Sequence, residues 1–184
     1  MTTTTATART AAASGAIRNG ATLMAVAAAG FIGYAVLFLV RNFTDSFLEL
    51  GIGQGEVSVS KEQIQQFSPS LYHYVSHLHI AVSGFIAATG LAVLLLAIYG
   101  VRSGQAWAWV AAVAAPVLGL AIALPAHYPW NLDTLGHLGL IYLATLVFVV
   151  GALLSGKGCW TPDGQRDRPS GTWPEANRPT EPGR

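Results

Sequence analysis

Four long runs of apolar residues constrain this chain more than any other feature of its sequence. The runs cover about residues 21–40, 71–99, 105–126 and 133–155. A helix of about 20 apolar residues is long enough to cross a hydrocarbon core about 30 Å thick. Because a backbone surrounded by lipid must satisfy its own hydrogen bonds, each run is predicted to be helical. The expected fold is therefore all-α: an integral membrane four-helix bundle with up-down-up-down topology.

The composition supports this class of protein. Hydrophobic residues make up 52% of the 184 residues and charged residues only 10%, against about 25% charged residues in a typical soluble domain. The formal net charge of +1 gives no reason to expect a nucleic-acid partner. The single cysteine, Cys159, excludes an intramolecular disulfide and a site made of thiolates alone. The abundance of Ala, Gly and Val is typical of small multi-pass proteins of high-GC bacteria, and it indicates no function.

The polar segments outside the runs predict the remaining organisation. A flexible N-terminal arm is expected over 1–20, a transmembrane domain over 21–155 and a disordered tail, rich in Pro, Gly, Arg and Glu, over 156–184. Ser60 followed by Gln63 matches a capping box, which predicts a short interfacial helix near 61–67 between the first two spans. Ser68 before Pro69 then predicts the start of the second long helix.

The basic residues near the ends of the runs predict the orientation in the membrane. Cytoplasmic loops carry an excess of Lys and Arg, and in this chain the excess lies on the side of both termini. That side holds Arg9, Arg18, Arg102 and Lys157, whereas the other holds Arg41 and Lys61. The chain is therefore expected in the cell membrane with both termini cytoplasmic.

All five histidines are expected at the opposite, extracytoplasmic end of the bundle. They are His73, His77, His79, His127 and His137. At helical spacing His73 and His77 share one face, flanked by small residues, so this face is predicted to point into the bundle. Asp133, a candidate N-cap of the last helix, shares a face with His137. With nearby tyrosines these residues predict a His/Tyr/Asp cluster at this end.

Metal binding is one function that fits this end of the chain. Imidazole is a ligand for Zn, Cu and Fe, which makes His73, His77, His79 and His137 candidate ligands of a transition metal. Haem is less favoured, because no matched pair of histidines lies deeper in two facing spans. The chain would then be an accessory membrane protein that binds a metal or a small ligand. Its expected partners are the lipid bilayer and either another membrane protein or a second copy of itself.

The sequence leaves two further interpretations open. In the first, the chain is a small membrane enzyme: His137 does acid–base chemistry on a lipid-soluble substrate and Asp133 orients its ring. In the second, histidine and tyrosine simply occupy the headgroup region as amphipathic residues. His127, beside Pro125, Tyr128 and Trp130, fits this second interpretation best.

Overall fold

The computed structural model describes the backbone of residues 2–44 and 50–160 and the side chains of residues 13–44 and 50–160. Its long helices are α1 (Thr2–Asn42), α4 (Pro69–Leu95), α5 (Ala106–Ala123) and α6 (Leu135–Cys159). Helix α4 continues through a π-helical turn, η1 (Leu96–Gly100), into a 3-10 turn, η2 (Val101–Ser103), and α5 continues into η3 (Leu124–Trp130). Two short helices, α2 (Gln54–Val57) and α3 (Lys61–Phe67), lie between α1 and α4.

The prediction of an all-α four-span bundle is confirmed. In the part of the chain that the structure describes, four stretches are long and apolar enough to cross a membrane, namely Ala13–Asn42, Pro69–Ser103, Ala106–Trp130 and Leu135–Cys159. Helix α1 also runs through residues 2–20, for which the sequence predicted an arm, because no proline interrupts them and alanine is abundant. Most of the predicted tail, from residue 161 onward, lies outside the described residues.

The caps at the polar end were largely foreseen. The Ser60 hydroxyl accepts from the Gln63 amide at 3.2 Å, and the Gln63 side chain accepts from the Ser60 amide at 2.7 Å. Ser68 caps α4 just before Pro69. The prediction of Asp133 as the cap of α6 is wrong: Thr134 occupies that position, and its hydroxyl accepts from the His137 amide at 3.2 Å.

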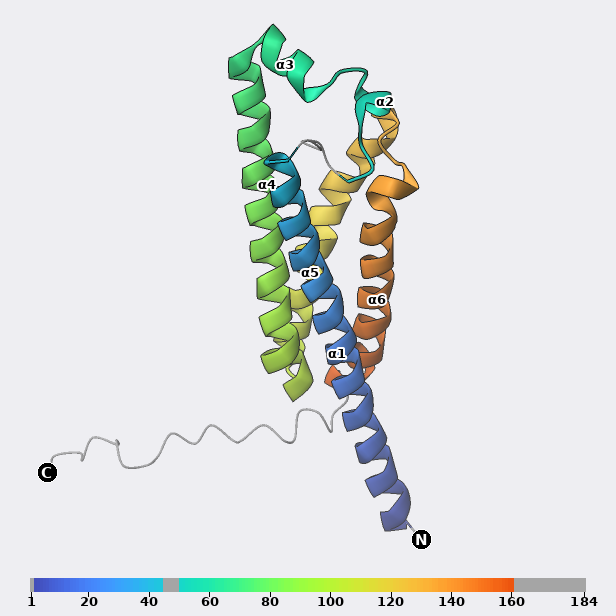
Figure 1. The fold of residues 1–184 in the computed structure, drawn as a ribbon. Coiled ribbons are helices and arrows are strands. Elements are labelled where there is room, and N and C mark those ends of the chain that lie inside the picture. Colours follow the sequence, from blue (N-terminus) through green and yellow to red (C-terminus); the bar gives the residue numbers. More distant parts are fainter. Residues whose placement is uncertain (1, 45–49, 161–184) are drawn as a thin grey trace, which may run out of the picture.

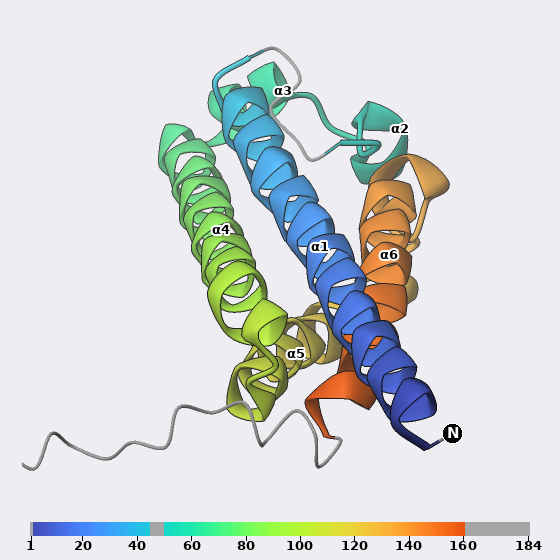
Figure 2. The ribbon, with the colours of Figure 1, turned by 90° about the horizontal axis from the view of Figure 1, so that it is seen from below.

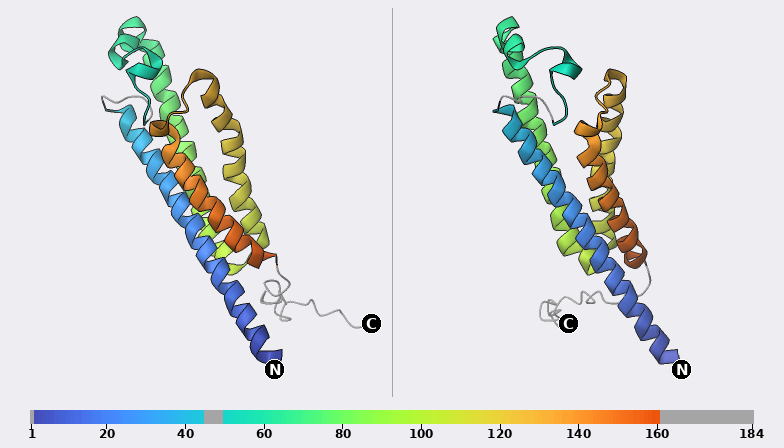
Figure 3. Two further views of the ribbon diagram at one scale, coloured as in Figure 1. Left: turned by 90° about the vertical axis from the view of Figure 1, so that its right-hand side faces the viewer. Right: turned by 45° about the vertical axis from the view of Figure 1, so that its right-hand side comes forward.

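Helix α1 occupies the centre of the bundle, between α4 and α6, with α5 behind (Figures 1 and 2). It packs mainly against α6 and α4. We call the end of the bundle where α1 begins and α6 finishes the amino-terminal end, and the opposite end, where α4 and α6 begin, the histidine end. The α1/α4 and α5/α6 pairs converge at the amino-terminal end and diverge toward the histidine end (Figure 3).

Small residues make the contact at the amino-terminal end close. A Cβ atom on Gly20 of α1 would lie 2.5 Å from the Gly151 carbonyl oxygen of α6. Met24 and Ala28 of α1, Val93 and Ala97 at the end of α4, and Ala108 of α5 are buried in the same cluster. Trp109 donates from Nε1 to the Ala152 carbonyl at 3.0 Å and so joins α5 to α6. This half of the bundle positions the four spans, and the histidine end holds the candidate site.

Candidate functional site

The five histidines lie near the histidine end, as predicted, but in two separate groups. His73, His77 and His79 lie on the first turns of α4, whereas His127 in η3 meets His137 in the first turn of α6. Within the described part of the chain, no group of three or more His, Cys, Asp or Glu side chains is placed to hold one metal ion. The metal set His73, His77, His79 and His137 therefore stays a prediction.

On α4 the structure separates His79 from the two histidines before it. His73 and His77 are exposed, whereas His79 is half-buried, with its ring centre 5.0 Å from that of Phe38 of α1. The prediction that His73 and His77 point into the bundle is wrong. The face that packs on α1 runs through Ser76, His79 and Ser83, which recur at intervals of three and four residues.

A buried polar contact marks where α1 and α4 meet near the site. Asn42, the last residue of α1, is 2% exposed and donates from Nδ2 to the Ser76 hydroxyl of α4 at 2.8 Å. Below it, the Ser83 hydroxyl donates to the His79 carbonyl at 2.7 Å and so satisfies its own hydrogen bond within the helix. The Asn42–Ser76 bond therefore joins α4 to α1 without using the histidine rings.

His127 and His137 form the second group and lie side by side. Their ring centres are 5.0 Å apart and their planes are inclined by 35°. His137 is 1% exposed, and its Nδ1 lies 3.0 Å from the Leu50 carbonyl oxygen. His127 Nδ1 lies 3.0 Å from the Ala123 carbonyl oxygen, one turn earlier in its own segment. From the sequence His127 was favoured as an interfacial residue, but the short connection between the third and fourth runs already placed it at the same end as His137 and left it open as a further ligand.

Residues 50–51, between α1 and α2, lie at the start of α6 and close over His137. There the Thr134 hydroxyl donates to the Gly51 carbonyl at 3.3 Å. Gly51 has a φ of +75°, and a Cβ atom on it would collide with the backbone of Gly136. Residues 50–51 therefore form a strap whose backbone lies directly on α6, which only glycine permits at this position.

The sequence predicted an acid–base pair in which the Asp133 carboxylate orients the His137 ring, and the structure gives that ring a backbone partner instead. Asp133 is exposed in the loop before α6. The Nδ1 atom of His137, the position that an orienting carboxylate would bind, faces the Leu50 carbonyl. A catalytic role for His137 with Asp133 stays a prediction.

An apolar hollow lies between the four spans, adjacent to the His127–His137 pair. Its volume is about 360 Å³. Among its described lining residues, Tyr34 and Thr89 carry the polar side-chain atoms, and the others are apolar. The lining consists of Ala28, Phe31, Tyr34, Val82, Phe85, Ile86, Thr89, Gly90, Val93, Ala115, Pro116, Gly119, Leu120, Ala123, Ile141 and Phe148. Ala123 and Ile141 are one helical turn from His127 and His137, so the pair lies just beyond the edge of the hollow nearest the histidine end, which we call its mouth.

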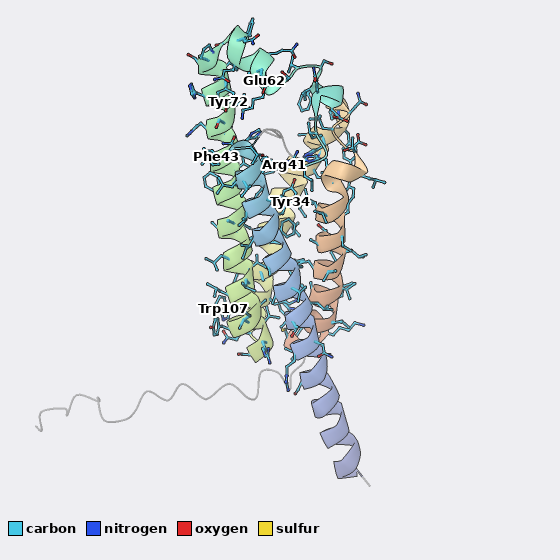
Figure 4. The ribbon with its side chains drawn as sticks, in the orientation of Figure 1. Tyr34, Arg41, Phe43, Glu62, Tyr72 and Trp107 are labelled. Atoms are coloured by element: carbon cyan, nitrogen blue, oxygen red, sulfur yellow. The ribbon has the colours of Figure 1, made fainter. Side chains whose placement is uncertain are left out.

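A second hollow opens between α1 and α6. Its volume is about 380 Å³, and it shares Phe31, Tyr34 and Ile141 with the first. Figure 4 labels Tyr34 on the half of α1 that leads to the histidine end. Nothing in the linear pattern of apolar residues indicated either hollow, because a cavity depends on how far the helices diverge.

One titratable group in the loop is clearly perturbed. The backbone amide at the start of α3, the Ser60 hydroxyl and the Lys61 ammonium hold the pKa of Glu62 below its usual range. Glu62, labelled in Figure 4, therefore stays ionised near neutral pH and caps α3 with a negative charge. A carboxylate in this state contributes charge to the polar end but is a poor proton donor.

Together, four apolar spans and a polar cap of loops define the class: the chain is a multi-pass membrane protein in contact with the lipid bilayer. Comparison of the chain with protein families, curated proteins and solved structures gives no match.

Proposed function

We propose that this protein binds a small lipid-soluble amphiphile, with the apolar part of the ligand in the hollow between the spans. The volume of about 360 Å³ lies within the range of small-molecule sites, which are apolar clefts with a few polar groups. Four different helices line the hollow. This arrangement distinguishes it from a shallow groove between two neighbouring helices.

The observation that carries the proposal is the small-residue face of α5. Ala115, Gly119 and Ala123 recur every four residues and all line the hollow. In bilayers such faces normally allow two helices to approach closely. Here no side chain or neighbouring backbone lies within 4 Å of a Cβ atom placed on Gly119. The small face therefore leaves space for a ligand rather than for a helix.

The ends of the hollow support an amphiphilic ligand rather than a purely apolar one. Its walls offer dispersion contacts, and apolar cavities of this kind exclude water. Its mouth lies one turn below two imidazole rings. A molecule with an aliphatic or isoprenoid tail and a polar head would place the tail against α5 and the head beside His127 and His137.

Photolabelling with a matched pair of variants tests the proposal. The probe is a long-chain alcohol with a diazirine in its tail, added to the full chain in mild detergent. Gly119→Leu, on α5, fills the hollow, whereas Gly84→Leu adds the same side chain on α4, at a position with open space that does not line the hollow. We expect labelling within residues 115–123 to fall at least about tenfold in Gly119→Leu, a loss of about 1.4 kcal/mol, and to persist in Gly84→Leu. Equal labelling of both variants would show that the hollow is not the site.

The membrane-enzyme alternative has less support. In that alternative Asp133 orients the ring of His137 so that it acts as a base. In the structure the Nδ1 atom of this buried ring faces the Leu50 carbonyl instead of a carboxylate. That carbonyl makes Asp133 unnecessary for orientation. If the enzyme alternative holds nonetheless, Asp133→Asn should abolish a pH-dependent activity that Gly84→Leu leaves intact.

The orientation and partners remain part of the proposal. The basic residues favour cytoplasmic termini, which would open the mouth of the hollow to the extracytoplasmic side. Reporter fusions at each terminus test this, since an alkaline phosphatase fusion active at either end would contradict it. An accessory role beside another membrane protein, or in a homo-oligomer, predicts that the purified chain elutes as a larger assembly.

A further inference from the structure

We propose that His127 and His137 form a transition-metal site at the mouth of the hollow. The proposal is independent of the amphiphile, because it depends on the two rings and their backbone partners alone. It differs from the metal set predicted from the sequence, with which it shares only His137. It replaces three histidines of α4 by one histidine of η3.

The hydrogen bonds of the two rings assign their tautomers. A carbonyl oxygen can only accept, so the Nδ1 atom of each ring must donate to its carbonyl partner. For His137 that partner is Leu50, and for His127 it is Ala123, each at 3.0 Å. In the neutral state the Nε2 atom of each ring therefore carries the lone pair. This is the form of histidine that binds a metal ion.

The separation of the rings suits one shared ion. Two imidazoles bound to one tetrahedral ion through nitrogens at about 2.0–2.1 Å place their ring centres about 5 Å apart. The observed separation of the His127 and His137 ring centres is 5.0 Å. The two rings are thus close enough to share one ion.

The backbone partners match the usual surroundings of a metal site. Histidine ligands commonly donate their second ring N–H to a carbonyl or carboxylate, which fixes the tautomer and orientation. Here the strap supplies one such carbonyl at Leu50, and the last turn of α5 supplies the other at Ala123. The strap is itself fixed on α6 by the Thr134 hydroxyl and by the glycine contact at Gly51. Both rings are therefore preorganised by elements far apart in the sequence.

The chemistry of the donors selects the class of metal. Imidazole suits Zn, Cu, Fe and Ni and disfavours the hard cations Mg and Ca. Two protein ligands, one fewer than in catalytic zinc sites, leave coordination positions open for water or for a ligand head group. Zn²⁺ is the probe for binding, and Co²⁺ reports the geometry through its visible absorption.

The experiment must separate this pair from the rival pair on α4. His73 and His77 are exposed and share a helix face, so they are able to chelate a metal at the surface. The measurement is Zn²⁺ binding to the full chain, purified in mild detergent without a metal-binding tag. The variants are His127→Gln, His137→Gln and the matched double change His73→Gln/His77→Gln.

We expect the tightest Zn²⁺ to persist in His73→Gln/His77→Gln and to weaken at least about tenfold in His127→Gln. His127 is the informative position, because its ring is half-exposed and its removal leaves the strap in place. His137→Gln should also lose the ion, with folding checked by circular dichroism, since this ring holds the strap. Co²⁺ bound to the double variant should show the intense absorption of a tetrahedral site.

Three outcomes would overturn the proposal. Zn²⁺ retained in His127→Gln would exclude this ring as a ligand. Zn²⁺ lost in His73→Gln/His77→Gln would place the site on α4 instead. No Zn²⁺, Cu²⁺ or Co²⁺ bound above background would leave the two rings as a packing contact. Gly119→Leu, which fills the hollow, should leave Zn²⁺ binding unchanged, so failure of the amphiphile proposal and failure of this one are distinguishable.

Discussion

The two ends of the bundle are built on different principles. At the amino-terminal end, α1 and α6 touch through their backbones: a Cβ atom on Gly151 would lie 2.7 Å from the Gly20 carbonyl oxygen. Farther along the bundle toward the histidine end, the space between the helices is two hollows that share Phe31, Tyr34 and Ile141. Figure 3 shows the helix pairs converging at one end and diverging at the other.

The close contact at one end explains the opening at the other. Two straight helices that cross at small residues must separate with distance from the crossing point. In α1 the residues beyond the crossing change from Gly20 and Ala21 to Phe31, Tyr34 and Phe38, which are too large for a second backbone contact. The strap at residues 50–51 contacts the start of α6 again through the Leu50 and Gly51 carbonyls. The close packing of α1 on α6 at Gly20 and Gly151 therefore leaves space between the helices farther along the bundle, where the two hollows lie.

The largest effect that would break this comparison is expected from Gly151→Ala. The added methyl group would meet the Gly20 carbonyl oxygen and the Met24 amide nitrogen, which are backbone atoms that cannot rotate away. We expect the free energy of unfolding to fall by about 3 kcal/mol or more. Gly139→Ala on the same helix has open space around it and should be neutral or stabilising by up to about 1 kcal/mol. The measurement is unfolding in mixed micelles; equal stability of the two variants would disprove the close crossing.

An intermediate effect is expected from Gly51→Ala in the strap. The positive φ of Gly51 costs other residues about 1–2 kcal/mol, and the methyl group would also collide with the Gly136 backbone. We expect the strap to leave α6 and tryptic cleavage after Lys61 to accelerate. Gly55→Ala, in the same loop with open space around it, is the control. If both variants resist trypsin like the wild type, the strap does not depend on Gly51.

The smallest effect is expected where α1 meets α4. Ser76→Ala removes the acceptor of the Asn42 Nδ2 bond, which is 2.8 Å long. Hydrogen bonds between membrane helices contribute about 0.6 kcal/mol on average, and we expect a loss of that order. A double-mutant cycle with Asn42→Ala measures the coupling free energy between Asn42 and Ser76. A coupling near zero would show that packing alone holds this corner.

Several features followed from the sequence because they depend on neighbouring residues. The capping box of Ser60 and Gln63 and the cap–proline pair of Ser68 and Pro69 are complete within a few residues. The up-down-up-down path, which brings all five histidines to one end, follows from helix length and short connections. Asp133 and Thr134 are adjacent, and either side chain is able to cap the start of α6. The structure uses Thr134, because a hydroxyl accepts from the His137 amide and also donates to the Gly51 carbonyl, whereas a carboxylate only accepts.

The sequence by itself determined the class of fold, because a bilayer demands long apolar helices and this chain contains four of them. It did not determine which histidines meet. Helix rotation and crossing angle decide that, and they depend on where small residues on different helices come into contact. His127 and His137 lie side by side, whereas His73 and His77 face away, because α1 packs on Ser76 and Ser83 of α4 and the strap closes on α6. The hollow, too, exists only in the tertiary structure, since it is the space left where the α1/α4 pair and the α5/α6 pair diverge.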